Sequence, residues 1–266
     1  AIANQKGGVG KTTTAINLAA CLAVAEKKTL VIDTDPQGNA TSGLGINKDS
    51  LDRSIYDVLS DDLPVGDAVV KNVHFPFLDV VPATRDLVGV EVELVSRRGR
   101  EGVLREALAS IRDRYEYIVI DCPPSLGLLT LNTMAAADSV LIPIQCEFYA
   151  LEGLSQLLNT ITLVQGSLNP RLQIEGVLMT MYDGRLNLSR QVADEAKEYF
   201  GPKVYRTTIP RNVRIAEAPS FGKPIVLYDV LSVGAKSYLS LANEVIARSG
   251  SRASEALPEP AGAGAR

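Results

Sequence analysis

The residues best suited to chemistry lie in a glycine-rich segment with two lysines, which follows an apolar run and precedes a stretch with helical spacing. This order is typical of a strand, a phosphate-binding loop and a helix. Glycines bring backbone N–H groups close to a ligand, and the positive end of the helix stabilises an anion at the same place. We therefore expect nucleotide phosphates to contact Gly7, Gly8, Val9, Gly10, Lys11, Thr12 and Thr13.

The loop differs from the usual phosphate-loop pattern at two positions. That pattern, G-x-x-x-x-G-K-[ST], begins with a glycine where this chain has Gln5, and Lys6 is an additional lysine inside the loop. In the common pattern the final lysine reaches the β- and γ-phosphates and the following hydroxyl binds Mg²⁺. These roles are expected here for Lys11 and Thr12.

Aspartates follow two short apolar runs that are rich in β-branched residues. The run 29–33 ends in Asp33, with Asp35 two residues later, and the run 117–121 ends in Asp121. Ligands of open α/β sheets bind beyond the carboxyl ends of the strands. An aspartate at the end of such a strand is typical of the residue that holds Mg²⁺ in phosphate-loop proteins, which predicts that role for Asp121. A solvated turn is the alternative explanation for these acids.

The elements that must position these residues alternate between strand and helix patterns. This alternation predicts an α/β fold, a single doubly wound and mostly parallel sheet flanked by helices, as in P-loop NTPases. One domain is expected over 1–248, and the polar, Pro- and Gly-containing stretch 249–266 is expected to be a disordered tail. Further strands are expected over 78–82, 139–144, 172–181 and 203–209, and helices over 11–26, 52–59, 63–70, 86–114 (broken near 99–102), 150–164, 187–200 and 235–247.

Composition limits the class of protein further. The 266 residues are 46% hydrophobic, but no apolar run approaches the roughly 18 residues that a membrane-spanning helix needs. Three widely spaced cysteines and a single histidine, His74, predict buried reduced thiols and no disulfide framework or histidine metal site. The net charge of −4 argues against uniform coating by nucleic acid, yet residues 185–223 carry eight Lys and Arg against four Asp and Glu. No signal peptide is evident, which favours a cytoplasmic protein.

Together these motifs resemble the deviant Walker A ATPases of the ParA/MinD family. The stretch 5–12 resembles their deviant Walker A motif, 33–39 their switch I and 121–125 their switch II. The stretch 209–220 resembles the chromosomal ParA (Soj) branch in particular. The similarity covers roughly residues 1–248.

The resemblance implies roles for individual residues. Asp35 would position the attacking water, and Lys6 would reach the nucleotide of a second subunit, so that two subunits enclose two ATP molecules. Thr12 and Asp121 would hold Mg²⁺. Met181, Pro210 and Asn212 would flank the adenine. Non-specific double-stranded DNA would be bound by Arg185, Arg190, Arg211 and Arg214.

The function implied is that of an ATP-dependent dimerising switch in chromosome or plasmid partition. ATP would drive dimerisation, the dimer would bind DNA on the nucleoid, and a ParB (Spo0J)-like protein would stimulate hydrolysis to ADP and phosphate. The alternative is a MinD-like membrane-associated division-site ATPase, but 250–266 lacks the basic amphipathic helix of that branch. A metabolic enzyme that shares the fold is a third possibility. A nitrogenase iron protein needs a cysteine arrangement that this chain lacks, and an amidoligase is expected to need an additional substrate domain.

Overall fold

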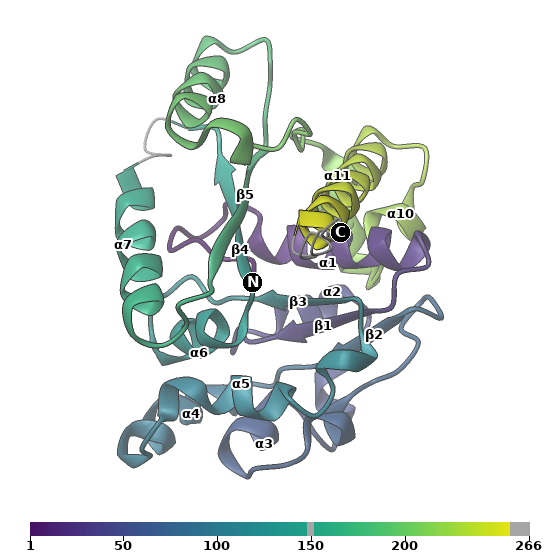
Figure 1. Cartoon of the computed structure of the whole chain (residues 1–266). Coiled ribbons are helices and arrows are strands. Elements are labelled where there is room, and N and C mark those ends of the chain that lie inside the picture. Colours follow the sequence, from purple (N-terminus) through teal and green to yellow (C-terminus); the bar gives the residue numbers. More distant parts are fainter. Residues whose placement is uncertain (148–151, 256–266) are drawn as a thin grey trace, which may run out of the picture.

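A parallel sheet crosses the middle of the molecule, with helices on both of its faces (Figure 1). The computed structural model describes residues 1–147 and 152–255. Ladders of hydrogen bonds place the strands in the orders β2–β1–β3 and β4–β5, and each of these ladders is parallel. The strands are β1 (Thr29–Asp33), β2 (Leu78–Val81), β3 (Tyr117–Asp121), β4 (Ser139–Gln145) and β5 (Gln173–Thr180).

The first residues of the chain join the two groups of strands. Ile2 lies between β3 and β4 and forms a parallel bridge to Asp121 on one side and to Leu141 on the other. Its N–H donates to the carbonyl of Ile120 at 2.8 Å, while the N–H of Leu141 donates to the carbonyl of Ala1 at 2.8 Å. The segment that leads into the glycine-rich loop therefore occupies the centre of the sheet, although it pairs only through single bridges.

Helices connect successive strands, which confirms the predicted doubly wound α/β fold. Helix α1 starts directly after Gly10, and α8 has the predicted bounds. The helices are α1 (Lys11–Val24), α2 (Asn39–Gly43), α3 (Ile55–Ser60), α4 (Leu87–Glu93), α5 (Val103–Leu108), α6 (Leu128–Ala136), α7 (Glu152–Ser167), α8 (Asn187–Phe200), α9 (Val213–Glu217), α10 (Ile225–Tyr228) and α11 (Val233–Glu255).

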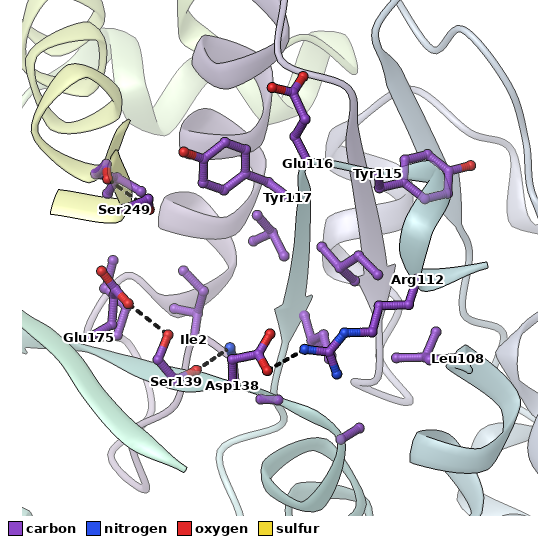
Figure 2. Close-up of a pocket in the computed structure, with 18 of the residues that line it drawn as sticks. Ile2, Leu108, Arg112, Tyr115, Glu116, Tyr117, Asp138, Ser139, Glu175 and Ser249 are labelled. Atoms are coloured by element: carbon purple, nitrogen blue, oxygen red, sulfur yellow. Dashed lines mark hydrogen bonds and ion pairs between the residues drawn. The ribbon is translucent and has the colours of Figure 1, made fainter. Parts of the chain in front are cut away.

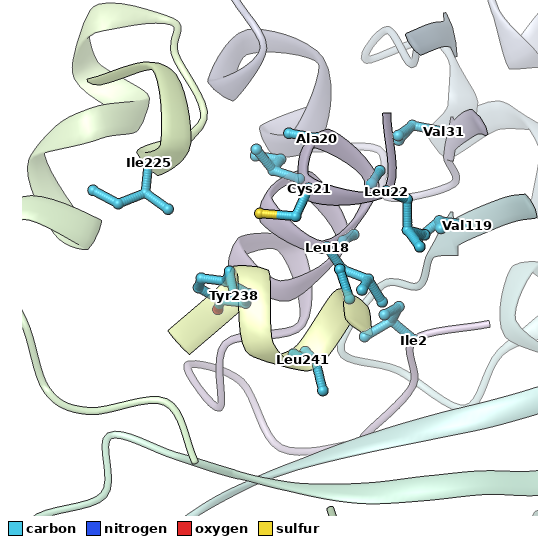
Figure 3. Close-up of a cluster of buried hydrophobic side chains, with 14 of the residues drawn as sticks. Ile2, Leu18, Ala20, Cys21, Leu22, Val31, Val119, Ile225, Tyr238 and Leu241 are labelled. Atoms are coloured by element: carbon cyan, nitrogen blue, oxygen red, sulfur yellow. The ribbon is translucent and has the colours of Figure 1, made fainter. Parts of the chain in front are cut away.

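Alternate residues of the strands face opposite cores, as the twofold repeat of a strand requires. Val31 of β1 and Val119 of β3 pack against α1, and α1 joins them in one apolar cluster with Tyr238 and Leu241 of α11 (Figure 3). On the other face, Leu30 and its alternating neighbours of β1–β3 pack against α3 to α6, and those of β4 and β5 against α6 to α8. All five strands are thus covered on both sides, which explains their continuous apolar sequences.

The structure differs from the sequence prediction after β5. No strand forms over 203–209: Tyr205 and Ile209 each donate an N–H to a carbonyl of β5 at 2.9 Å, but only isolated bridges result. The reason is that the side chain of Glu244 accepts the intervening N–H groups of Arg206 and Thr207, at 3.0 and 3.1 Å. Helix α11 continues past the predicted end at 247 to Glu255, and residues 256–266 of the expected tail lie outside the described residues.

Shorter elements also replace some of the expected helices. The helix expected over 63–70 is a 3-10 turn at Val65–Ala68, and the one expected over 86–114 divides into α4 and α5 with 3-10 turns between and after them. Helical geometry ends at Ser96, because Arg97 is extended, and it resumes at Arg100 after Gly99, which has a φ of 72°. Helix α3 starts at Ile55 because Ser54 caps it in a capping box with Asp57. Helix α7 begins at Glu152, and the expected start at 150 lies outside the described residues.

Gly176 of β5 is predicted to be intolerant of a side chain. A Cβ at this position would lie 2.5 Å from Cε2 of the buried Tyr205 and 2.8 Å from the carbonyl oxygen of Lys203. Gly176→Ala should therefore lower the free energy of unfolding by roughly 1–3 kcal/mol, measured by urea denaturation. Gly166→Ala in α7 is the matched control, because a Cβ there meets no atom within 4 Å. Equal stability of the two variants would contradict this account of the close approach.

Candidate functional site

The glycine-rich loop has backbone angles that L-residues with side chains rarely adopt. Gly8 and Gly10 have φ values of 75° and 88°, and Gly10 directly precedes the first residue of α1. A Cβ added at Gly7 or Gly8 would meet no atom within 4 Å, so the surface of the loop is open to a ligand. A concave run of glycine N–H groups at the start of a 14-residue helix suits a phosphate.

Two buried side-chain contacts fix this loop to the sheet, and a third contact lies within the loop segment. Asn4 donates an amide hydrogen to the carbonyl of Pro143 at 2.8 Å and accepts the N–H of Lys6 at 3.0 Å. Thr180, the last residue of β5, donates its hydroxyl to the carbonyl of Val9 at 2.8 Å. The loop is therefore anchored to the ends of both β4 and β5, which makes it a preorganised binding element.

Lys11 lies at the base of the loop with only 6% of its surface exposed. Its ammonium donates to the carbonyl of Lys6 at 2.9 Å. Burial lowers the pKa of Lys11, while the negative charges of Asp121, Cys122 and Asp35 act in the opposite direction. A buried cation next to an open glycine loop is suited to attract phosphate oxygens.

The strand-end aspartates of β1 and β3 are neighbours in the sheet. Asp33 and Asp121 are register partners in the parallel ladder, and both are fully buried. The carboxylate of Asp33 accepts the N–H and the hydroxyl of Thr41, at 2.8 and 2.7 Å, and the N–H of Asp35 at 3.1 Å. Burial nevertheless raises the pKa of Asp33 to about 6. Asp33 therefore supports the loop that carries Asp35 and has few lone pairs left for a ligand.

Asp121 fits a metal ligand better than a structural residue. Among the described residues, neither of its carboxylate oxygens accepts a hydrogen bond within normal geometry. Burial raises its pKa well above the ordinary value, and Asp33 raises it further, whereas the Thr12 hydroxyl and Lys11 lower it. A buried carboxylate without donors is costly unless a cation compensates it. Asp121 and Thr12 are thus the residues that would hold Mg²⁺.

The described residues contain no cluster of three or more His, Cys, Asp or Glu side chains that could hold a metal by itself. Mg²⁺ is commonly bound by one or two protein oxygens together with substrate phosphates and water. Asp121 and Thr12 would provide only two protein ligands, which agrees with a Mg²⁺ ion that binds together with the nucleotide phosphates.

Asp121→Asn should stabilise the protein without nucleotide and metal at neutral pH. The substitution removes a buried, unpartnered charge, which should raise the free energy of unfolding by roughly 1–3 kcal/mol. Because the folded-state pKa of Asp121 is raised, the folded parent takes up a proton as pH falls through that pKa. The advantage of the variant should therefore be full above the folded pKa and shrink towards pH 4.

Thermal unfolding in EDTA between pH 4 and 8 measures this effect. Asp61→Asn, a change at an exposed acid, is the control and should shift the midpoint little at any pH. A lower midpoint for Asp121→Asn than for the parent at pH 8 would mean that the carboxylate is satisfied in the folded protein.

Asp35 and Lys6 lie on the loops that border this site. Asp35 is 7% exposed, and its carboxylate accepts the N–H of Gln37 at 2.9 Å. The ammonium of Lys6 is 3.6 Å from the carboxylate of Glu147, just after β4, and about a third of its side chain is exposed. Both participants are partly solvated, so this ion pair is weak and Lys6 is available to a second molecule.

The residues predicted to flank an adenine come from two neighbouring segments. Met181 directly follows β5 and has a φ of 50°, and Pro210 forms a parallel bridge with the adjacent Tyr182. Asn212 uses its side-chain oxygen to accept the N–H of Ile215 at 3.3 Å, where it caps α9. The structure therefore brings Met181 and Pro210 together, and gives Asn212 a structural role beside them.

The four arginines predicted to bind DNA are exposed, and each has a partner within the chain. Arg185 forms a two-pronged contact with Asp183 at 2.7–2.9 Å, and Arg190 donates to the carbonyl of Gly184 at 3.0 Å. The guanidinium of Arg211 is 3.8 Å from Glu147, and that of Arg214 is 3.1 Å from Glu217. Exposed ion pairs such as those of Arg185, Arg211 and Arg214 contribute about 0–1 kcal/mol, so phosphates can replace their acidic partners.

A cavity lined by other described residues lies away from all of these residues. Its volume is about 730 Å³, and it is found at the opposite edge of the sheet, where β3 and β4 begin (Figure 2). Arg112 and Asp138 form an ion pair at its rim, and Ser139 donates its hydroxyl to Glu175 at 2.7 Å. None of the predicted site residues lines this cavity, so it is not the candidate site.

Sequence reasoning missed the residues that support the site. Thr41 binds Asp33, Asn4 and Thr180 anchor the loop, and Glu147 contacts both Lys6 and Arg211. Only Asn4 has a local signal, because it lies within the loop segment. His74 contacts the carbonyls of Leu44 and Gly222 at 2.9 and 2.8 Å, which joins two distant loops.

Known proteins resemble this chain in sequence and in structure. An AAA domain family model matches residues 1–174. The sporulation initiation inhibitor protein Soj of Bacillus subtilis is 61% identical over 247 residues, which cover 93% of this chain and 97% of Soj. The chromosome partitioning protein ParA of Myxococcus xanthus is 59% identical over 93% of this chain and 87% of its own length.

Solved structures share the fold. A cobyrinic acid a,c-diamide synthase of Mycobacterium smegmatis, with bound ADP and magnesium, matches with a TM-score of 0.82 and 37% identity over 94% of both chains. The septum site-determining protein MinD of Pyrococcus horikoshii, complexed with Mg-ADP, matches with a TM-score of 0.76 and 26% identity over 94% of this chain and 96% of its own. With the deviant loop and both strand-end aspartates assembled at one sheet edge, the chain belongs to the ParA/MinD family of deviant Walker A ATPases, on the chromosomal ParA (Soj) branch.

Proposed function

We propose that this protein is an ATP-dependent dimerising switch that acts in chromosome or plasmid partition. The Mg-ATP-bound dimer binds double-stranded DNA without sequence preference and is therefore cytoplasmic and associated with the nucleoid. A ParB (Spo0J)-like protein stimulates hydrolysis to ADP and phosphate and so releases the dimer. One observation supports the proposal most strongly. The chain is 61% identical to Soj, and it combines a phosphate loop that contains Lys6 and Lys11 with the strand-end carboxylate of Asp121, for which the described residues provide no hydrogen-bond donor.

The geometry supports a division of labour within the site. The open glycine loop and Lys11 bind the phosphates, and Thr12 and Asp121 hold Mg²⁺. When bound, the metal neutralises charge that develops on the phosphates. Asp35, fixed by its contacts to Gln37 and Asp33, orients the attacking water rather than acting as a strong base. Because phosphoryl transfer depends mainly on positioning and charge neutralisation, these residues suffice once Lys6 arrives from a second subunit.

The test is to follow mass and DNA binding together. Light scattering should show a monomer without nucleotide or with ADP, and a dimer with ATP. Under the same conditions only the ATP-bound dimer should sediment with plasmid DNA, and it should not sediment with anionic liposomes. Binding to liposomes in place of DNA would favour the MinD-like alternative, while an ATP-independent monomer would contradict the switch.

Loss of the predicted DNA-binding arginines should weaken binding to all sequences equally. The pairs Arg185→Ala/Arg190→Ala and Arg211→Ala/Arg214→Ala each remove up to two phosphate contacts. Each pair should therefore reduce the slope of log affinity against log salt by about 1 to 2. Fluorescence anisotropy on two unrelated duplexes, over a range of salt concentrations, measures this.

The control for the arginine experiment is Arg112→Ala/Arg114→Ala, because these residues precede β3 at the opposite edge of the sheet. It should leave the salt slope unchanged. A variant that loses affinity for one duplex only would argue against non-specific phosphate binding.

Metabolic activity is a less favoured alternative. The Mycobacterium smegmatis protein named a diamide synthase matches over 94% of both chains, so the expected need for an additional substrate domain does not separate the two classes. The higher identity to Soj and ParA favours partition. Among the described residues, no helix is long and apolar enough to cross a membrane.

A further inference from the structure

Exposed apolar side chains gather where α9, α10 and the start of α11 meet. These three helices pack against one another, and Figure 1 shows α10 beside α11. Each side chain of the group is at least 42% exposed, and we call the group the apolar patch: Val213, Phe221, Leu227, Val230, Leu231 and Val233. Neighbouring apolar side chains that are exposed together commonly mark a site of protein interaction.

The apolar patch rests on a base that is fixed to the core. Ile215 and Ile225, from the same segment, are buried in the cluster that contains α1. The N–H of Ile225 also donates to the side chain of Asn17 in α1, at 2.6 Å. On the outside, the ring of Phe221 stacks on that of Tyr228 with 5.1 Å between the ring centroids. The surface is therefore preorganised, which lowers the entropic cost of binding a partner.

The charged residues around the apolar patch leave an excess of positive charge. Both acids of 211–236, Glu217 and Asp229, contact the guanidinium of Arg214, at 3.1 and 3.6 Å. Lys223 and Lys236 are exposed, and neither forms an ion pair with another residue that the structure describes. Two unpaired cations beside an apolar surface favour a partner that combines acidic and apolar side chains.

These features favour a protein partner over DNA and over lipid. The phosphates of DNA offer an exposed apolar side chain no surface to pack against, so DNA leaves the apolar patch uncovered. Clusters of about four to eight basic residues are typical of proteins that bind anionic lipid. Within 211–236, Arg211 and Arg214 face acids, which leaves Lys223 and Lys236. A protein segment matches both the charge and the apolar character.

We propose that the apolar patch is the docking site for an acidic protein segment with apolar side chains. Aspartates or glutamates of that segment lie beside Lys223 and Lys236. Its apolar side chains pack on Leu231 and Val233, which are the most exposed end of α11 and of the turn before it. Docking of short segments on an apolar surface is a common mode of peptide recognition.

The partner and DNA compete for this surface. Arg211 and Arg214, to which DNA binding is assigned above, belong to the same segment as the apolar patch. A bound acidic segment therefore covers them and repels phosphates, so that the protein leaves DNA without hydrolysis of ATP. The competition rests on the proposed function, whereas the docking itself does not.

The test uses three fluorescein-labelled synthetic peptides and the full chain without nucleotide. The first peptide has leucine at helical spacing and glutamate at its charged positions. The second has lysine in place of every glutamate, and the third has serine in place of every leucine. Fluorescence anisotropy should show binding of the first peptide, and the second and third should bind at least about tenfold more weakly.

Two double variants locate the site. Leu231→Ser/Val233→Ser should weaken the first peptide about tenfold, because two apolar contacts are lost. Lys223→Gln/Lys236→Gln should weaken it about threefold to tenfold, and this difference should shrink as salt rises.

The matched control is Val88→Ser/Val92→Ser in α4. The exposed fractions of these valines, 62% and 76%, match the 60% and 78% of Val233 and Leu231. The control should bind the first peptide as the parent does. Because all of these side chains are exposed, the variants should also unfold at nearly the parental temperature.

Equal affinity of the parent and the Leu231→Ser/Val233→Ser variant for the first peptide would overturn the docking site. Equal binding of the first and second peptides would do the same. Loss of ATP-dependent dimerisation in that variant, without peptide, would assign the apolar patch to a second copy of the chain. Sedimentation of the parent but not of the variant with anionic liposomes would assign it to lipid. Either assignment would overturn the proposal.

Competition with DNA is measured separately, with a non-hydrolysable ATP analogue that excludes release by hydrolysis. The unlabelled first peptide should release the parent from plasmid DNA, and the Leu231→Ser/Val233→Ser variant should need about tenfold more peptide. Retention of the parent on DNA at saturating peptide would contradict the competition. A parent that binds the peptide but never binds DNA would refute the proposed function and leave the docking site intact.

Discussion

The Lys6→Ala variant should bind ATP but hydrolyse it roughly a thousandfold more slowly than the parent. A cationic group that reaches the transferred phosphate from a second molecule contributes at least about that factor in related chemistry. Within one chain, the ammonium of Lys6 contacts Glu147, and its backbone carbonyl accepts from Lys11. Truncation of the side chain leaves that carbonyl in place, so phosphate binding should persist while turnover is lost. Steady-state phosphate release and nucleotide titration measure the two effects.

A mixing experiment decides whether Lys6 acts in its own subunit or in its partner. A dimer of one Lys6→Ala chain and one Asp35→Ala chain has a single complete site only if the lysine crosses the interface. Equimolar mixtures should therefore regain part of the parental turnover, although each variant alone is inactive. Absence of any recovery in mixed dimers would place Lys6 in its own site. Lys27→Ala, which removes an exposed cation paired with Glu116 at 2.9 Å, is the control and should retain full turnover.

The Asp35→Ala variant should accumulate as an ATP-bound dimer. The carboxylate of Asp35 is fixed by the N–H of Gln37, and its own N–H donates to Asp33. Loss of a residue that orients the attacking water should slow hydrolysis by about 10²–10⁴-fold without removing the phosphate or metal contacts. ATP should then hold the subunits together, and light scattering should report a dimer long after the parent has returned to monomers.

The control for the accumulation of the ATP-bound dimer is Asp61→Ala, a change at an exposed aspartate outside the loop that carries Asp35. It should cycle like the parent. An Asp35→Ala chain that stays monomeric in ATP would show that Asp35 contributes to dimer formation rather than to hydrolysis.

The sequence alone predicted those helices and strands that are determined by the pattern of their own residues. β1 and β3 form over the predicted residues. A short, continuously apolar run rich in β-branched residues is typical of a strand that is buried on both faces of a parallel sheet. The patterns predicted Asp33 and Asp121 at the carboxyl ends of their strands, but their adjacency comes from the strand order of the sheet. Helix α8 was also predicted in full, because its apolar residues repeat at helical spacing.

Contacts between distant segments were beyond such reasoning. The segment 203–209 has a strand-like composition, yet the carboxylate of Glu244 captures two of its N–H groups and prevents a ladder. Thr41 and Glu147 are ordinary polar residues in sequence, and only the fold places them beside Asp33 and Lys6. The intramolecular partners of the four arginines likewise depend on how loops meet after folding.

The central place of Ile2 has a consequence for biosynthesis. Its neighbours in the sheet, β3 and β4, follow more than a hundred residues later in the chain. In a growing polypeptide the strand partners of Ile2 are therefore absent until about residue 145 has left the ribosome. Pairing over such a separation in sequence is slow. The nucleotide-binding loop consequently matures late, so a truncated translation product should be unable to sequester ATP. Among fragments of increasing length released from the ribosome, only those that contain both β3 and β4 should therefore retain nucleotide.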